Sequence, residues 1–181
     1  LYCMTEDYGR WERMTKEYLA TASSIVETEK RNPSTLTNLS ILRYRQSLSL
    51  LYVQSLIVGD FDCAKRCSEE SLRMLPEPSA SGTKDDMKNA MERATLLCQL
   101  ANVHRLTNEP ATADKLLLEA LEIVEKSRGK MCSEYVEVLT SLGHAAETAG
   151  QLDTAVAWLE QAREIVNQLH EKATADAAES L

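Results

Sequence analysis

The sequence contains few of the residues that interrupt helices. It has six Gly and four Pro among its 181 residues, and these lie mostly between stretches with apolar periodicity. Aromatic residues are also scarce, whereas Ala, Leu, Glu and Lys, which favour helix, are abundant. This composition is unlike that of a disordered chain and indicates a helical protein long enough to bury a substantial core.

Long apolar runs and a basic surface are both missing. No run of 18 apolar residues occurs, so no membrane-spanning segment is predicted. The net charge is −8, and residues 131–181 carry nine acidic residues against only Arg163 and Lys172. A negative surface with a single Phe does not favour binding of nucleic acid. The acidic C-terminal part fits either a basic protein partner or a solvated surface.

The cysteine content does not fit a secreted disulfide framework. Five cysteines are scattered along the chain, at positions 3, 63, 67, 98 and 132. An odd number in a chain of this length indicates reduced thiols and therefore an intracellular compartment, either cytoplasmic or organellar, with the mitochondrial matrix as one option. Since the sequence begins at Leu1, whether a targeting peptide preceded it stays open.

A short motif recurs along the chain without gaps. Each copy has a turn residue, then a helix start, then Ala five positions after the turn residue. The copies are Gly59–Ala64, Asn108–Ala113 and Gly150–Ala155, and Gly9–Met14 is a weaker one. Upstream of each alanine by 13 residues lies a leucine, and the copies are separated by 50, 49 and 42 residues. The recurrence predicts a chain built of repeated helix pairs.

The spacing of small and large apolar residues explains how such pairs would pack. Small residues let two helices approach closely, and larger ones at i, i+3, i+4 and i+7 fill the space between them. In the last copy, Gly150 supplies the turn, where a positive φ is inexpensive for glycine. The predicted face of the first helix is Leu139, Leu142, Gly143 and Ala146, and that of the second is Leu152, Ala155, Val156, Leu159 and Ala162.

The residues from Leu142 to Ala162 follow the pattern L-G-x-x-A-x-x-x-G-x-L-x-x-A-x-x-x-L-x-x-A. This pattern resembles the tetratricopeptide repeat, and residues 100–126 more specifically resemble the 42-residue repeats of kinesin light chains. Ser68 and Ser71 stand where the family has core residues. The resemblance implies an all-α fold in which antiparallel helix pairs stack as a short right-handed solenoid.

Local signals set the expected helix boundaries. Pro33 ends a first helix, Ser34 or Thr35 caps the next, Thr83 with Asp86 forms a capping box, and Pro110 fits a first turn. We therefore expect a single domain over residues 1–181. Its expected parts are a half-unit helix over 1–32, helix pairs over 34–75, 84–128 and 131–171, a loop over 76–83, and a cap or tail over 172–181.

Candidate chemistry is sparse. His144 and Glu147, or Cys63 and Cys67, have spacings that could place two ligands on one metal, but a closed site needs three or four. No nucleophile elbow, Gly-rich phosphate loop or paired-carboxylate signature accompanies the histidines and cysteines. We therefore predict no catalytic residue, no metal and no cofactor, and we expect the cysteines to be small, buried apolar residues.

In tetratricopeptide proteins the first helix of each pair lines a concave groove. Carried over to this sequence, the resemblance implies a partner-binding set at Asn102, Arg105, Glu137, Thr140, His144 and Glu147. The alternative for each position is an ordinary solvated polar side chain. The clamp for a partner's carboxylate used by one subclass looks absent, because Ser49 and Cys98 stand where its first lysines would be.

Two functions fit these observations. The first is a non-catalytic scaffold or adaptor that binds a protein segment, with a basic segment as one option, in the groove. The alternative is a structural subunit or assembly factor permanently integrated in a large multiprotein hetero-complex, with an organellar complex as one option. An enzyme is a third reading that no residue constellation supports.

Overall fold

The computed structural model describes residues 38–76 and 83–179 together with positions 9, 13, 17, 20 and 24. The described ranges contain six helices and no strand, which confirms the all-α prediction. Apart from the five isolated positions, the predicted helix over 1–32 lies outside the described residues, and so do its stop at Pro33 and the cap at Ser34 or Thr35.

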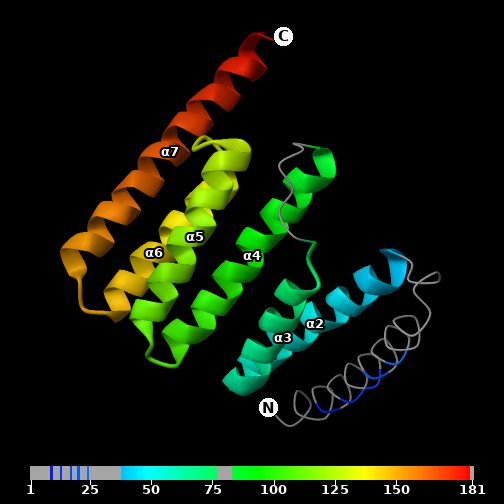
Figure 1. Cartoon of the computed structure of the whole chain (residues 1–181). Helices are drawn as coiled ribbons and strands as arrows, with labels where there is room; N and C mark the ends of the chain where they lie inside the picture. The colour runs from blue at the N-terminus through cyan, green and yellow to red at the C-terminus, as the bar shows by residue number, and fades with distance from the viewer. Residues whose placement is uncertain are drawn as a thin grey trace. The chain divides into compact units, whose positions relative to one another are not determined.

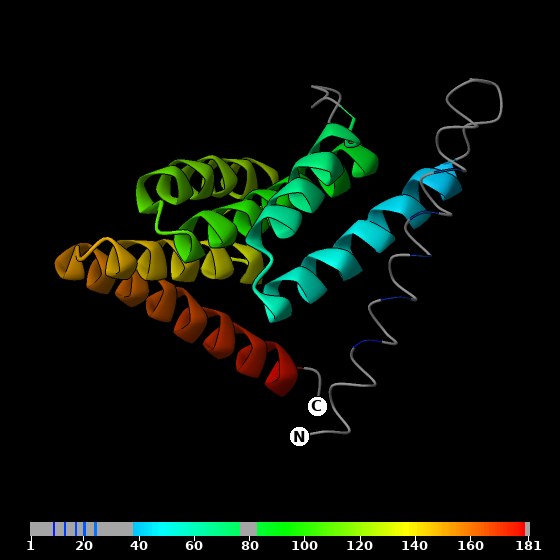
Figure 2. The same cartoon turned by 90° about the horizontal axis from the view of Figure 1, so that it is seen from below.

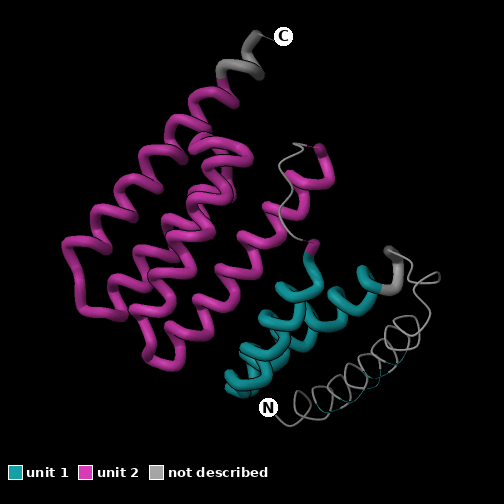
Figure 3. The backbone as a smooth tube through the Cα atoms, in the orientation of Figure 1, with its two compact units in different colours: residues 1–75 teal, residues 76–181 magenta. Residues whose placement is uncertain are grey.

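The chain forms two compact units, residues 1–75 and 76–181 (Figure 3). In the first unit, α2 (Asn38–Val58) packs against α3 (Phe61–Arg73). Asp60 caps α3 by accepting a hydrogen bond of 3.0 Å from the backbone N–H of Cys63. The prediction that residues 1–181 form a single domain stays a prediction.

The second unit contains two further helix pairs (Figures 1 and 2). The first pair is α4 (Lys84–Leu106) and α5 (Pro110–Arg128), and the second is α6 (Ser133–Thr148) and α7 (Leu152–Glu179). Besides the contacts within each pair, α5 contacts α6 and α4 contacts α6. The first helices of the two pairs are therefore neighbours, which is the arrangement that a groove lined by first helices requires.

Two of the predicted boundary signals, the capping box at Thr83 and the proline at position 110, act as expected. The Thr83 side chain accepts from the Asp86 backbone while Asp86 accepts from the Thr83 backbone, so the capping box is formed. Pro110 lies in the first turn of α5. Gly129, at φ 77°, follows α5 and its N–H bonds to the carbonyl of Glu125.

The turn between the two helices of each pair has the same geometry three times. The aligned residues Gly59, Asn108 and Gly150 all have positive φ, at 80°, 62° and 75°. In each turn the next residue donates to the carbonyl five positions back, as Asp60 does to Ser55 at 2.8 Å, Glu109 to His104 at 2.7 Å and Gln151 to Ala146 at 2.9 Å. This 6→1 bond is typical of a Schellman motif, which explains why only Gly and Asn occupy the position.

Close helix crossings contain the predicted alanines. Ala113 and Ala155 are both buried, as expected for small residues where two backbones approach. At the crossing of α6 and α7, a Cβ built on Gly143 would lie 2.7 Å from Cγ of Leu159. No side chain fits at position 143 unless Leu159 moves.

Two details of the last helix differ from expectation. Leu152 and Val156, predicted to face the first helix of their pair, are exposed, whereas Ile165 is buried. The reason is the helical period: positions 155, 162 and 165 lie on the side of α7 toward α6, and 152 and 156 lie on the adjacent side. The helix also continues to Glu179 instead of ending near residue 171, in keeping with the Ala-rich sequence there.

The described helices were also searched for a membrane span. None of those in residues 38–76 and 83–179 is both long and apolar enough to cross a bilayer.

Candidate functional site

The neighbouring helices α4 and α6 form a small cleft. It has a volume of about 90 Å³, and α4 and α6 supply most of its walls. Three residues of the predicted set, Asn102, Arg105 and His144, line it together. The other lining residues are Cys98, Ala101, Leu117, Ser141 and Ala145. Residues separated by about 40 positions in the sequence thus meet because the two helix pairs stack in register.

The polar side chains of α4 in this cleft are held by one another. Nη2 of Arg105 donates to Oδ1 of Asn102 over 2.8 Å, and both side chains are half-buried. The two residues are three positions apart and so share one helix face. The bond orients the guanidinium, which keeps further donors available for a carboxylate or a carbonyl.

The α6 side of the cleft carries an imidazole and a carboxylate. Nδ1 of His144 lies 3.5 Å from Oε2 of Glu147, and both side chains are exposed. An exposed contact of this length contributes little to stability. The pair therefore presents a polar edge that is free to rearrange around a bound group.

Cys98 lies at the same cleft. Burial raises the pKa of the Cys98 thiol to about 12, and the negative charge of Glu137 adds to the effect. The thiol consequently stays protonated at neutral pH, which is unsuitable for a nucleophile or a metal ligand. Together with Ala101, Leu117 and Ala145 it makes the cleft apolar between its polar edges.

The structure does not bring all six predicted residues to the cleft. Thr140 does not line it, and its hydroxyl donates to the backbone carbonyl of Val136 over 2.8 Å. Glu137 and Glu147 are exposed beside it. Sequence reasoning missed Ser141, although its position three residues before His144 places both on one face of α6.

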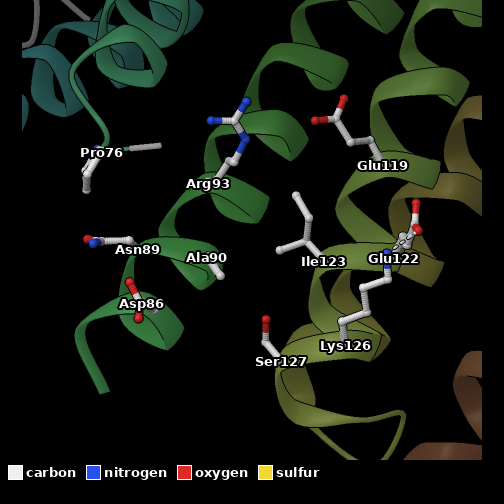
Figure 4. A pocket seen from close by; sticks show the side chains of 10 residues that line it. All are labelled: Pro76, Asp86, Asn89, Ala90, Arg93, Glu119, Glu122, Ile123, Lys126 and Ser127. Atoms are coloured by element: carbon white, nitrogen blue, oxygen red, sulfur yellow. Dashed lines mark hydrogen bonds and ion pairs between the residues drawn. The ribbon is translucent and has the colours of Figure 1, made fainter. Parts of the chain in front are cut away.

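A larger cleft lies between the first half of α4 and the second half of α5 (Figure 4). Its volume is about 430 Å³, with Ala90 and Ile123 among its apolar lining and charged residues such as Arg93 and Glu119 around it. Nearby, Nζ of Lys126 lies 2.5 Å from Oε1 of Glu122, and this bond lowers the pKa of the Glu122 carboxyl. None of the six residues predicted to bind a partner lines this cleft, and no motif in the sequence indicated a site here.

His104 is the one buried histidine among the described residues. Its Nδ1 lies 2.8 Å from Oε2 of Glu109, across the turn between α4 and α5. In the described ranges the two other histidines, His144 and His170, are exposed. The same ranges hold no group of three or more His, Cys, Asp or Glu residues that could bind a metal ion.

Comparison with known proteins identifies the repeats of the second unit. Residues 92–168 match the tetratricopeptide repeat family, which confirms the resemblance predicted from the pattern between Leu142 and Ala162. This segment includes most of α4, all of α5 and α6, and the first part of α7. No curated protein matches the chain in sequence.

Several solved structures are similar to the chain. Two are crystal structures of nearly identical TPR-like repeats that are described as those of a kinesin light chain from Podosopora anserina. The first is 15% identical, with a TM-score of 0.42 and coverage of 94% of this chain and 96% of that one. The second is 16% identical, with a TM-score of 0.41 and coverage of 93% and 95%. A third, BtubC from P. vanneervenii, is 16% identical, with a TM-score of 0.30 and coverage of 86% and 92%.

Proposed function

We propose that this chain, whose residues 92–168 are tetratricopeptide repeats, is a non-catalytic adaptor that binds a protein segment on the face formed by α4 and α6. Repeats of this kind generally mediate protein–protein interactions through the extended surface that stacking creates. The observation that carries the proposal is the cleft in which Asn102 and Arg105 of α4 meet His144 of α6.

The charges around the cleft favour a partner segment of mixed charge. Arg105 offers its guanidinium to an acidic or carbonyl group of the segment. Glu137 and Glu147 are exposed on α6 and favour a Lys or Arg further along. Rim pairs of this kind contribute only about 0–1 kcal/mol each. They consequently set orientation and association rate more than affinity.

The test reverses the charge of the two exposed carboxylates on α6, Glu137 and Glu147. Affinity capture with the wild-type chain, followed by mass spectrometry, first identifies a binding partner. Glu137→Lys combined with Glu147→Lys is then expected to slow association with that partner and to flatten its dependence on salt. Association rates measured over a series of salt concentrations check this.

A charge-matched variant provides the control. Glu119→Lys with Glu125→Lys makes the same charge change at exposed positions of α5, away from the cleft. It should leave the salt dependence of association close to that of the wild type. If both double variants bind the same partner at the same rate across the salt series, the binding surface lies elsewhere and the proposal is wrong.

One observation favours the second candidate, a subunit built permanently into a larger complex. The side of α7 that carries Leu152 and Val156 leaves apolar side chains exposed. Such a face is typical of proteins with a lasting protein contact. Purification at high salt separates the two functions, because a permanent subunit stays with its complex whereas a transiently bound adaptor, whose association rate falls as salt screens the rim charges, dissociates.

A further inference from the structure

One side of α7 carries an exposed apolar stripe. The stripe residues are Leu152, Val156, Leu159 and Val166. They recur at intervals of four, three and seven, so they lie on one face of the helix. The stripe borders the face that packs on α6, where Ala155, Ala162 and Ile165 are buried, and Leu159 at its edge also lies against Gly143 of α6.

The internal repeat shows what covers such a stripe. Leu159 and Val166 in α7 correspond to Leu117 and Val124 in α5, 42 residues earlier. Leu117 and Val124 are each 1% exposed, whereas Leu159 is 38% and Val166 is 46% exposed. The α5 positions are buried because α6 packs beside α5, and Leu117 lines the same cleft as Ser141 and Ala145 of α6. At these two positions α7 therefore presents a helix-binding surface that is filled in one repeat and open in the next, while Leu152 and Val156 correspond to Pro110 and Asp114.

The charge beside the stripe differs from that in α5. Exposed carboxylates of α7 follow the stripe along one side, at Asp153, Glu160 and Glu171. The corresponding positions 42 residues earlier are Ala111 and Leu118 in α5 and Gly129 just after it, none of which is charged. None of the three carboxylates belongs to an ion pair within the described residues. The open face thus has a border of carboxylates without an ion pair, whereas the carboxylates on that flank of α5, Glu122 and Glu125, pair with Lys126 and Lys130.

We propose that this face of α7 binds a basic amphipathic helix of a separate protein, which lies along α7 as α6 lies along α5. Leu and Ala side chains of that helix would cover Val156, Leu159 and Val166. Its Lys or Arg residues on one flank would meet Asp153, Glu160 and Glu171. Arg163, which lies on the stripe between Leu159 and Val166, selects for a polar or acidic residue opposite it.

A second copy of this chain fits the face less well. In an antiparallel pairing of two α7 helices through their stripes, the acidic rows of both copies lie on the same side of the contact. Like charges placed opposite one another oppose association. The charge pattern therefore favours a basic partner over self-association.

The test uses a synthetic helical peptide of 16 residues, the length of α6. The peptide carries an Ala/Leu stripe with lysines along one flank, and a second peptide has glutamates in place of the lysines. We expect the lysine peptide to bind the full wild-type chain. The glutamate peptide should bind the wild-type chain about tenfold more weakly than the lysine peptide does. The variant Val156→Ser with Val166→Ser should bind the lysine peptide about tenfold more weakly than the wild type does. Fluorescence anisotropy of labelled peptides measures the affinities.

Two controls make the outcome specific. Leu106→Ser with Leu118→Ser removes apolar side chains of similar exposure on α4 and α5 and should bind the lysine peptide as the wild type does. Arg105→Glu, in the cleft between α4 and α6, should also leave this binding unchanged, which separates the inference from the proposed function. Equal binding by the Val156 and Val166 variant, failure of the wild type to bind, or a homodimer that this variant abolishes would each overturn the proposal.

Discussion

The two units place residues of opposite size at the same positions of the helix crossing. In the α6–α7 pair, Gly143 leaves room for Leu159, and a Cβ at position 143 would lie 2.7 Å from Cγ and 2.8 Å from Cδ2 of that leucine. In the α2–α3 pair, the repeat register puts Tyr52 at the glycine position and Ser68 at the leucine position, and both are buried. The α6–α7 crossing thus combines a small residue on its first helix with a large one on its second. The α2–α3 crossing combines a large residue on its first helix with a small one on its second.

Burial of serine in α3 is compatible with this exchange. Oγ of Ser68 donates to the carbonyl of Ala64 over 3.2 Å, and Oγ of Ser71 donates to the carbonyl of Cys67 over 2.9 Å. Each hydroxyl is therefore satisfied within its own helix, and neither needs a partner across the crossing. The comparison teaches that the residue types at a crossing have only to fill the same space together.

The largest effect is expected from Ser68→Leu, which brings the leucine of the second unit into the first. With Tyr52 still present, the added carbons overfill a buried site and should lower the free energy of unfolding by about 1–3 kcal/mol. Adding Tyr52→Ala provides the space, so the double variant should be more stable than the sum of the single changes predicts, by about 0.5–3 kcal/mol. Urea denaturation followed by circular dichroism measures all three variants. Strict additivity would show that Tyr52 and Ser68 do not face each other.

A smaller effect is expected from Gly143→Ala, which fills the space in the second unit. The new Cβ forces Leu159 to move, and the gain in helix propensity of about 1 kcal/mol offsets part of that cost. We expect a net loss of up to about 1 kcal/mol, because Leu159 is partly exposed and can shift.

The background Leu159→Ala makes this second test decisive. Once the leucine is shortened, Gly143→Ala keeps only its favourable effect on the helix and should stabilise by about 1 kcal/mol. The same substitution thus changes sign between the two backgrounds in thermal unfolding experiments. Equal effects in both would show that Leu159 does not limit position 143.

Much of this fold could be predicted from the sequence because the same pattern of turn residues and small apolar residues occurs in each repeat. The turn residues at 59, 108 and 150, the capping box at Thr83 and the alanines at the crossings each follow from local chemistry. The exposed side of α7 could not be predicted from the same pattern, since Leu152 and Val156 fit an apolar stripe whether or not a helix covers them. Burial of a helix face depends on the neighbouring element, which the helix's own sequence does not encode.

The candidate site was predictable only in part, for a related reason. Asn102, Arg105 and His144 follow from the resemblance to tetratricopeptide repeats, because first helices line one surface. Thr140 was predicted on the same basis, but its hydroxyl bonds to the backbone of its own helix. Competition between a local backbone carbonyl and an external partner is decided by side-chain rotamers, which the repeat pattern does not specify.

The smallest effect concerns one thiol in each unit, the buried Cys67 and the half-buried Cys98. Burial raises the pKa of Cys67 in α3 to about 12, with Cys63 adding to the effect, and it raises the pKa of Cys98 in α4 to about 12 as well. A thiol whose pKa is higher when folded than its ordinary 9.0 contributes stability that is complete below pH 9.0 and is lost as the pH rises toward 12. The urea midpoint of the wild type should therefore fall more steeply from pH 9.0 to about 11 than that of Cys67→Ala or Cys98→Ala. Parallel decreases in all three proteins would mean that neither thiol loses its proton more readily on unfolding, and that both units owe their alkaline sensitivity to other groups.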